Sequence, residues 1–355
     1  MKIKRVAVWK EALALTKPYA IASGSFDAVD NIFIRLDADK GGFGIGVASP
    51  ATDVTGESTA DCYDALTHCL APELQGRQIG NLGALVGELS AFVPAAPAAM
   101  AAVDMAMHDL LATGAGIPLV DYLGRCHHSL ATSVTIGISP VVQTLEEAST
   151  YVDQGFRILK VKIGQDVEED LERLFRLRER AGSDITIRVD INQGYTPEAF
   201  ADFVRKSEPL DLELAEQPLN RDHTEAMLRY PEAVRKKAAA DESLHDVQDA
   251  LRLAEHPQPF GIFNIKLMKC GGITPGVRIA DIARRAGIDL MWGCMDESVV
   301  GIAAALHAAL ACPATRYLDL DGHLDLARDL AAGGFELCAG QLRTLNRPGL
   351  GVVLR

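Results

Sequence analysis

The sequence predicts an α/β protein: a parallel β/α barrel that follows a smaller N-terminal α+β region. Eight short Val/Ile-rich runs recur at intervals of roughly 25 to 30 residues from about residue 130, and charged stretches with helical spacing separate them. Residues 1 to about 60 instead alternate apolar runs with turn residues, which is typical of an antiparallel sheet. With 48% apolar and 23% charged residues, the 355-residue chain can bury a sizeable core.

The N-terminal sheet is expected from two apolar runs, Ile3 to Trp9 and Ile32 to Leu36. The residues that break this pattern are Lys17-Pro18, Gly24 and Lys40-Gly41-Gly42. Glycines 42, 44 and 46 lack the spacing and the following helix of a dinucleotide-binding loop, so a hairpin is favoured. From Ala60 to about Gly124, Ala- and Leu-rich segments at helical spacing predict helices.

The barrel strands follow in order. They are predicted at Ser133–Ile138, Ile158–Ile163, Thr186–Asn192, Leu212–Gln217, Lys237–Glu242, Ile262–Met268, Asp289–Met295 and Tyr317–Asp321. The last part of the chain comes too late to extend the barrel and is expected to return to the N-terminal region. We therefore expect an N-terminal domain at residues 1–125, a catalytic barrel at 126–322 and a C-terminal segment at 323–355.

Composition excludes several classes of protein. A formal charge of −13 would repel nucleic acids and anionic membranes, and it suits a cationic or metal-bound ligand, although it could serve solubility alone. Seven cysteines without a CxxC pair argue against a disulfide framework or a zinc knuckle. Because no secretory signal and no membrane span are recognisable, we expect a cytoplasmic protein.

Nearly every predicted strand ends in an ionisable residue. These residues are Lys160, Lys162, Asp190, Glu216, Asp241, Lys266, Asp296, Asp319 and Asp321. The carboxyl ends of parallel barrel strands open onto one face, so these side chains are expected to converge. One such charge could equally be a helix cap or a solvated rim residue, but charges repeated in successive units predict an active site.

Asp190, Glu216 and Asp241 fall on three successive strands. Three carboxylates brought together without a cation would repel one another strongly. Oxygen ligands without His or Cys favour a hard ion such as Mg²⁺ over zinc. The sequence therefore predicts a magnesium site, and pairing with a lysine is the alternative for any single carboxylate.

Lys160 and Lys162 are two residues apart, so both side chains are expected to point into the barrel. Neighbouring positive charge and partial burial would favour the neutral amine of Lys162, which can act as a base. Lys266 lies four strands further around the ring. Two amines that face each other across a metal ion can take a proton from one face of a carbon, through an enediolate, and return a proton to the other face. The implied reaction inverts a stereocentre.

The motifs around these residues resemble the muconate-lactonizing-enzyme subgroup of the enolase superfamily, over essentially the whole chain. They are Lys160-Val-Lys162, Asp190-Ile-Asn192, Glu216-Gln-Pro218, Asp241-Glu-Ser243 and Asn264-Ile-Lys266. The resemblance implies a modified TIM barrel, (β/α)7β, with an N-terminal α+β capping domain. It also implies that Asp190, Glu216 and Asp241 bind Mg²⁺, that Lys162 and Lys266 are the acid/base pair, and that Lys160 tunes Lys162 and touches the substrate carboxylate.

The last predicted strand favours one activity within that subgroup. Asp319-Leu-Asp321 is similar to the motif with which dipeptide epimerases hold the free α-ammonium group of the substrate, and residues 293–298 resemble the seventh-strand segment of those enzymes. Two carboxylates on one strand face suit a primary ammonium, whereas pairing with Arg316 is the structural alternative. The resemblance thus implies epimerisation of the C-terminal residue of L,L-dipeptides, with further substrate contacts from Thr135, Lys160, Asp296, Ser298 and Phe26.

The capping region departs from the family pattern, because Gly46-Val-Ala48 stands where many members have Gly-Glu-Ala. The loop Gly24–Asp30, which closes over the substrate in that family, carries two acids here, Asp27 and Asp30. Together with Asp296 and the acidic charge, these acids suggest dipeptides with cationic side chains, Arg or Lys.

Other activities fit parts of this pattern. A cycloisomerase, an o-succinylbenzoate synthase or an N-acylamino acid racemase would use the lysines and the metal but not Asp319 and Asp321. A Schiff-base aldolase would leave the carboxylates unexplained, and a binding module would leave the whole acid/base set unused. The expected partner is a dipeptide, not a nucleic acid or a membrane, and the resemblance implies a homo-oligomer.

Overall fold

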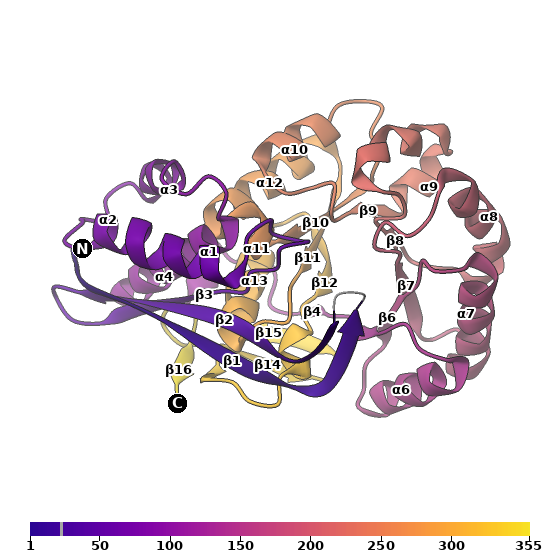
Figure 1. The fold of residues 1–355 in the computed structure, drawn as a ribbon, viewed down its shortest axis with the longest axis horizontal. Helices are drawn as coiled ribbons and strands as arrows, with labels where there is room; N and C mark the ends of the chain where they lie inside the picture. The colour runs from indigo at the N-terminus through magenta and orange to yellow at the C-terminus, as the bar shows by residue number, and fades with distance from the viewer. Residues whose placement is uncertain (22–23) are drawn as a thin grey trace.

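The computed structural model describes residues 1–21 and 24–355, and the side chains of these residues except 17–21 and 24–26. An N-terminal α+β part lies beside a ring of parallel strands, and helices surround the ring (Figure 1). No helix in the described part of the chain is long and apolar enough to cross a membrane.

The N-terminal sheet is antiparallel, as predicted, with the order β1 (Ile3–Ile21), β2 (Gly24–Ala38), β3 (Phe43–Ala48). The first two strands are longer than their apolar runs, because Lys17-Pro18 does not end β1. The pairing register shifts between Ala14 and Tyr19 instead, so the strand continues past a proline that cannot donate a ladder hydrogen bond. Figure 1 shows the β1–β2 pair extending from the N-terminal part toward the barrel, where Leu15 bridges Leu326.

Glycines 44 and 46 in β3 allow a helix to lie directly on the sheet. A Cβ atom on Gly44 would lie 2.1 Å from the backbone oxygen of Ala106, and one on Gly46 would lie 1.9 Å from that of Ala102. Both oxygens belong to α4 (Pro97–Ala115), a helix that is buried along most of its length. The glycine cluster therefore serves strand–helix packing, in agreement with the prediction of a hairpin.

Shorter helices complete the N-terminal part. They are α1 (Thr59–Asp64), a π-helical turn η1 (Ala65–Leu70), α2 (Ala71–Leu74), α3 (Leu82–Ser90) and α5 (Leu119–Leu123). Ser58 begins α1 with a capping box, because its hydroxyl accepts from the backbone of Asp61 and the Asp61 carboxylate accepts from the backbone of Ser58. Gly116, with φ of 72°, ends α4.

The barrel has eight parallel strands, and each of the eight predicted runs overlaps one of them. They are β5 (Val134–Ile136), β6 (Ile158–Lys162), β7 (Thr186–Asp190), β8 (Ala215–Glu216), β9 (Ala238–Ala240), β10 (Ile262–Lys266), β11 (Asp289–Gly293) and β12 (Thr315–Asp319). Neighbours in this order are hydrogen-bonded, and a parallel bridge between Thr132 and Leu318 joins the two ends. The ring has the (β/α)7β architecture that the resemblance implied.

Helices lie between successive strands and surround the ring (Figure 1). They are α6 (Val141–Asp153), α7 (Val167–Ala181), α8 (Pro197–Ser207), α9 (Glu232–Lys236), α10 (Val247–Leu253), α11 (Leu267–Cys270), α12 (Ile273–Ala286) and α13 (Val299–Ala311), with 3-10 turns η2 (Glu208–Leu210), η3 (Arg221–Arg229) and η4 (Gly322–Asp325). Most have one apolar face, whereas α13 is buried almost all round. Leu214, Ala239, Ile262 and Met291 form a small separate cluster.

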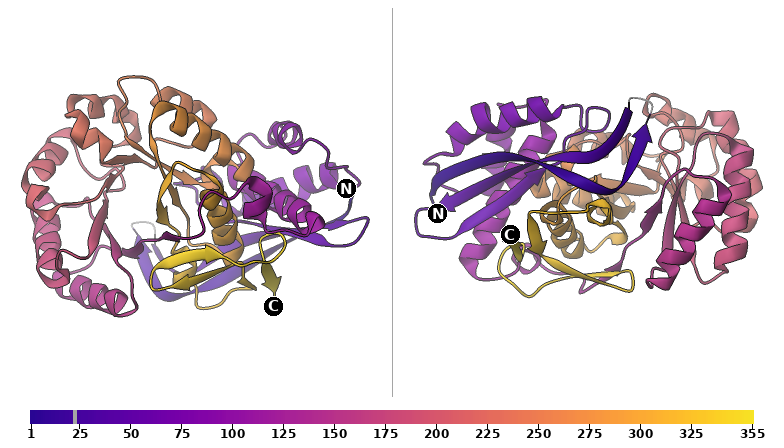
Figure 2. Two further views of the ribbon diagram at one scale, coloured as in Figure 1. Left: turned by 180° about the vertical axis from the view of Figure 1, so that it is seen from behind. Right: turned by 60° about the horizontal axis from the view of Figure 1, so that its bottom comes forward.

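The C-terminal segment forms two small sheets beside the barrel (Figure 2). One pairs β14 (Phe335–Cys338), β15 (Gln341–Thr344) and β4 (Leu130–Ala131), and the other pairs β13 (Ala331–Gly333) with β16 (Val352–Leu354). The segment also contacts the N-terminal part. The backbone nitrogen of Ala327 donates to the backbone oxygen of Ala14 at 2.8 Å, and that of Leu350 donates to the Asp109 carboxylate of α4 at 2.7 Å. The domain boundaries at 125/126 and 322/323 stay predictions.

Candidate active site

Lys160 lies at the centre of the ionisable residues that end the barrel strands. Its ammonium nitrogen is 3.0 Å from Asp190, 2.8 Å from Glu216 and 2.7 Å from Asp319, and its side chain is 4% exposed. Burial opposes its charge, but the three carboxylates outweigh this effect and raise the pKa of Lys160 well above its ordinary value. The structure thus places Lys160 as a buried countercharge to the carboxylates, and its expected contact with a substrate carboxylate stays a prediction.

Asp241 follows β9 and is shared by two lysines. The ammonium group of Lys266, at the end of β10, lies 2.8 Å from Oδ2 of Asp241. That of Lys269, on α11, contacts Oδ1 and the backbone oxygen of the same residue. Burial opposes ionisation of Asp241, but the two ammonium groups hold its pKa well below the ordinary range. The pKa of Lys266 is raised, because Asp241 and Glu216 overcome the effect of burial.

Gln217 fixes the backbone that carries Asp241. Its side-chain oxygen accepts from the backbone nitrogens of Asp241 and Ser243, each at 3.0 Å, and its side-chain nitrogen donates to Leu219 and to the hydroxyl of Ser243. Gln217 itself has φ of 35°, in the left-handed region. This buried amide therefore joins the ends of β8 and β9 at the carboxylates.

Lys162 is the more accessible member of the lysine pair. Its side chain is 42% exposed, its nitrogen donates to Oδ1 of Asn192 at 3.1 Å, and it lies 3.8 Å from Asp190. Lys162 ends β6 and Lys266 ends β10, with three strands between them, so they stand on different sides of the ring. The carboxylates of Asp190, Glu216 and Asp241 end or follow those three strands.

The site fits a hard divalent cation in its donor chemistry. Asp190, Glu216 and Asp241 offer only oxygen atoms, and Oε2 of the fully buried Glu216 lies 2.8 Å from the Lys160 ammonium nitrogen. Burial and the nearby charge of Asp190 raise the pKa of Glu216 to about 8. The carboxylates are arranged around lysine ammonium groups, however, and among the described residues no group of three or more Asp, Glu, His or Cys side chains is placed so that it could hold a metal ion.

Asp319 and Asp321 do not share one face of a strand, which corrects the prediction. Asp319 ends β12, whereas Asp321 has helical backbone angles and precedes η4. Asp319 accepts from the hydroxyl of Ser133 at 2.6 Å and pairs with Lys160, and Asp321 accepts from the backbone nitrogen of Thr135 at 2.6 Å. Burial and the charge of Asp319 raise the pKa of Asp321 to about 7. The two acids still lie together, across the junction between β12 and β5.

The other residues predicted to contact the substrate lie in different surroundings. Ser298 is fully buried, and its hydroxyl caps α13 and donates to Asp329 at 2.8 Å, so it is committed to the protein. Asp296 is anchored through its backbone oxygen, which accepts from Ser49 of the N-terminal part at 3.0 Å. Asp30 pairs with Lys10 at 3.4 Å. The side chain of Phe26 lies outside the described residues.

Three groups near the site were missed by the sequence analysis. Lys269 lies on a helix after the strand, where a strand-end pattern cannot reveal it. Glu297 is buried, its pKa is raised to about 8 by burial, and one of its oxygens has no hydrogen-bond donor. Glu242 accepts from Asn192 at 3.3 Å, and burial and Asp241 raise its pKa to about 7. Glu242 and Glu297 fall within quoted motifs, but the motifs gave them no role.

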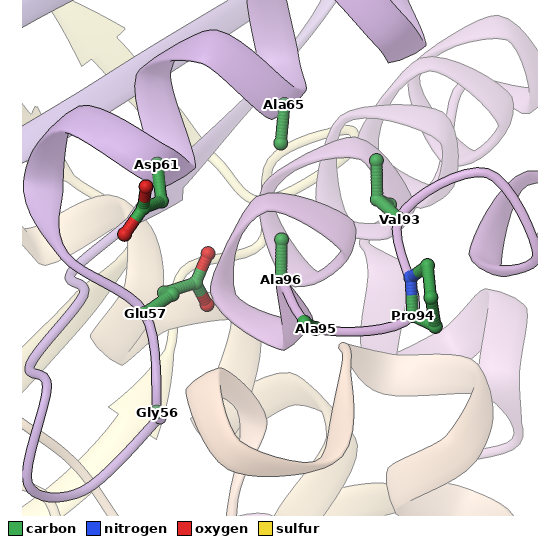
Figure 3. Close-up of a pocket in the computed structure, with 8 residues that line it drawn as sticks. All are labelled: Gly56, Glu57, Asp61, Ala65, Val93, Pro94, Ala95 and Ala96. Carbon is green, nitrogen blue, oxygen red and sulfur yellow. The ribbon is translucent and has the colours of Figure 1, made fainter.

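A pocket of about 290 Å³ is lined by residues of the N-terminal part, between Gly56 and Ala96 (Figure 3). The Glu57 carboxylate faces it, and its pKa is raised to about 7 by burial. Glu57 accepts from the backbone nitrogen of Ala98 at 2.5 Å, in the first turn of α4. Since a carboxylate at this position caps the helix, the pocket has a structural explanation.

The chain is similar to known proteins over nearly its whole length. The chain matches the family models "Mandelate racemase / muconate lactonizing enzyme, N-terminal domain" at residues 3–124 and "Enolase C-terminal domain-like" at residues 143–355. It is 55% identical over 352 residues to an L-Lys-D/L-Arg epimerase of Desulforapulum autotrophicum, with 99% of each chain covered. It is 53% identical to a crystal structure of the dipeptide epimerase from Methylococcus capsulatus complexed with Mg and the dipeptide L-Arg-D-Lys, with a TM-score of 0.97 over 99% of this chain and 100% of that one. A substrate complex of the L-Ala-D/L-Glu epimerase from Bacillus subtilis is 32% identical, with a TM-score of 0.94 over 99% of each chain.

Proposed function

The chain belongs to the mandelate racemase/muconate lactonizing enzyme family of the enolase superfamily, and from this membership we propose that it is a Mg²⁺-dependent epimerase of dipeptides that contain Lys and Arg. It is an isomerase, as are its relatives at 55% and 53% identity, which are both named L-Lys-D/L-Arg epimerases. The observation that carries the proposal is the placement of two lysines on different sides of a ring whose intervening strands end in carboxylates.

Proton transfer is assigned to Lys162 and Lys266. The neutral amine of one lysine takes the α-proton of the C-terminal residue of the dipeptide and becomes an ammonium group. The ammonium group of the other lysine then gives a proton to the opposite face of the same carbon and becomes neutral. One proton enters and one leaves, so the net change is inversion at that carbon.

Asp190, Glu216 and Asp241 are assigned to hold Mg²⁺. When bound, the ion supplies positive charge to the substrate carboxylate. Their oxygen-only chemistry and the complete burial of the Glu216 carboxylate support this assignment. Lys160, buried among Asp190, Glu216 and Asp319, keeps part of this negative charge balanced within the protein.

Asp319 and Asp321 are assigned to the free α-ammonium group of the dipeptide. Both carboxylates are buried at the junction of β12 and β5, where an ammonium group would find negative charge. Asp296 follows β11 and is linked to the N-terminal part through Ser49, so we assign it to the cationic side chain of the substrate. Oligomeric state and cellular location stay predictions.

The test uses a pooled library of L,L-dipeptides incubated with the protein and Mg²⁺ in D₂O. Mass spectrometry counts the gain of one deuteron at the α-carbon, and the gain should be largest for dipeptides of Lys and Arg. The library includes N-succinyl-Arg, because an N-succinyl-L-Arg/Lys racemase of Bacillus cereus is 32% identical to this chain. Exchange of N-succinyl-Arg without exchange of any dipeptide would contradict the proposal and the assignment of Asp319 and Asp321.

A further inference from the structure

Lys269 is a buried lysine that the proposed reaction does not use. It lies on α11, three residues after Lys266, and 3% of it is exposed. Its ammonium group donates to the backbone oxygen and to Oδ1 of Asp241. A buried ammonium group is costly unless it is paired and hydrogen-bonded, so these contacts with Asp241 are what make its position tolerable.

Each oxygen of the Asp241 carboxylate has its own lysine. Lys266 is 2.8 Å from Oδ2, and Lys269 takes Oδ1. Lys266 can therefore leave the pair without stranding a buried carboxylate that has no countercharge. This freedom matters, because a lysine that exchanges protons with a substrate carbon must approach that carbon.

Lys269 is held in place from the side of the N-terminal part. The helix α11 packs against α4, and a Cβ atom on the following Gly272 would lie 2.6 Å from the Asp104 carboxylate of α4. Asp104 also accepts from the backbone nitrogen of Thr274 at 2.9 Å and from its hydroxyl at 2.6 Å, in the first turn of α12. The backbone around Lys269 is thus fixed between β10 and α4, while Lys266 lies at the end of β10 with 12% of its side chain exposed.

We propose that Lys269 is a positioning residue, which keeps Oδ1 of Asp241 bonded throughout the reaction so that Lys266 can leave Oδ2 and serve the substrate. The proposal rests on the epimerase function given above. Without the ammonium group of Lys269, Lys266 is the remaining lysine partner of Asp241 and stays paired with it. The rate of proton transfer by Lys266 then falls more than the rate of proton transfer by Lys162.

The test measures initial α-proton exchange in D₂O separately for the two epimers of one Lys/Arg dipeptide. Lys162→Ala and Lys266→Ala first identify which epimer each lysine deprotonates. Lys269→Met, which keeps the length of the side chain but removes its charge, should lose about tenfold more exchange with the epimer served by Lys266 than with the other epimer. Lys269→Arg should restore most of that loss.

Titration calorimetry with Mg²⁺ gives a readout that does not depend on turnover. Lys269→Met should bind Mg²⁺ at least as tightly as the unmodified protein, because a positive charge beside the carboxylates is removed. Equal losses with both epimers, or loss of Mg²⁺ binding, would make Lys269 a structural residue and overturn the proposal. If Lys269→Met does not fold, Lys269→Gln is measured with the same expectation. Failure of the epimerase function itself looks different, because the unmodified protein then exchanges no dipeptide α-proton.

Discussion

Single polar side chains in this barrel each connect several strands. Lys160 of β6 contacts carboxylates from β7, β8 and β12, and Gln217 joins the ends of β8 and β9. Such groups are fully partnered inside a low-dielectric interior, where an unpartnered polar atom would be costly. Two of the buried oxygens without a donor, on Glu242 and Glu297, lie near these strand ends, where a ligand or an ion is expected.

Asp296→Asn should weaken the preference for cationic dipeptides. Removal of one negative charge near the side chain of the substrate should lower kcat/KM for a Lys-Arg dipeptide about tenfold, and that for Ala-Ala less than about twofold. Steady-state kinetics with both dipeptides checks this, and Asp211→Asn, at an acid that is 96% exposed and precedes β8, serves as the control. Equal losses with the two dipeptides would show that Asp296 has no part in selecting charge.

His307 should make the protein sensitive to acid. Burial lowers the pKa of His307 from 6.5 to about 3. Its Nδ1 accepts from the backbone nitrogen of Val120 at 2.8 Å. The unfolded chain binds the proton more readily than the folded protein. The contribution of neutral His307 to stability is therefore fully present above pH 6.5 and is lost as the pH falls toward 3. At pH 5 the loss from this residue is about 2 kcal/mol.

Urea unfolding at pH 7.5 and pH 5 measures this effect. His307→Asn, which keeps an acceptor for Val120, should be less stable at pH 7.5 by about 1 kcal/mol but should lose less stability on acidification. The same loss between the two pH values in both proteins would show that another group controls the acid response.

The strands and helices were predictable to the extent that local pattern decides them. All eight barrel runs were found, because apolar strands alternate with amphipathic helices in this architecture. The extent of β1 was not predicted, since its continuation past Pro18 depends on pairing with β2. Asp321 was assigned to the strand face by a spacing of two, but the chain already turns into η4 at that residue. The spacing to Lys266 could not reveal Lys269, whose position depends on packing against α4.

The packing of α4 on β3 should tolerate no side chain at Gly46. Gly46→Ala places a Cβ atom 1.9 Å from the backbone oxygen of Ala102, so the strand and the helix must separate. The expected loss of unfolding free energy is about 3 kcal/mol or more, measured in urea. Gly87→Ala in the exposed part of α3, where a Cβ atom meets nothing within 4 Å, is the control and should be neutral or stabilising by up to about 1 kcal/mol. Equal effects of the two substitutions would refute the packing argument.

Across the whole molecule, α4 ties the three parts of the chain together. Its Asp104 holds Thr274 of α12, and its Asp109 accepts from the backbone nitrogens of Ile45 in β3 and Leu350 near the C-terminus. One hydrophobic cluster runs through the N-terminal part, the barrel and the C-terminal hairpins. The placement of the N-terminal part beside the barrel is therefore built into the common core.

Because the net charge is −13, kcat/KM should depend on ionic strength more strongly for a cationic dipeptide than for a neutral one. At saturating Mg²⁺, an increase in salt from about 0.01 M to 0.15 M shortens the screening length from about 30 Å to about 8 Å. The value of kcat/KM for a Lys-Arg dipeptide should then fall about threefold or more, and that for Ala-Ala should change little. Parallel salt responses of the two substrates would remove any role for long-range attraction.

The ring of strands closes between β12 and β5, where the hydrogen bonding differs from that of a regular strand pair. Between β12 and β5 the backbone nitrogen of Ser133 donates to Leu318, but that of Leu320 donates to the hydroxyl of Thr132 and that of Thr135 donates to the carboxylate of Asp321. The junction between β12 and β5 is thus held in part by side chains, one of which, Asp321, is assigned to bind the substrate. The rate at which the Thr135 amide hydrogen exchanges with solvent therefore reports on the hydrogen bond between Thr135 and Asp321. Slower or faster exchange on ligand binding would show, at one peptide group of the 355-residue chain, whether Asp321 keeps this bond.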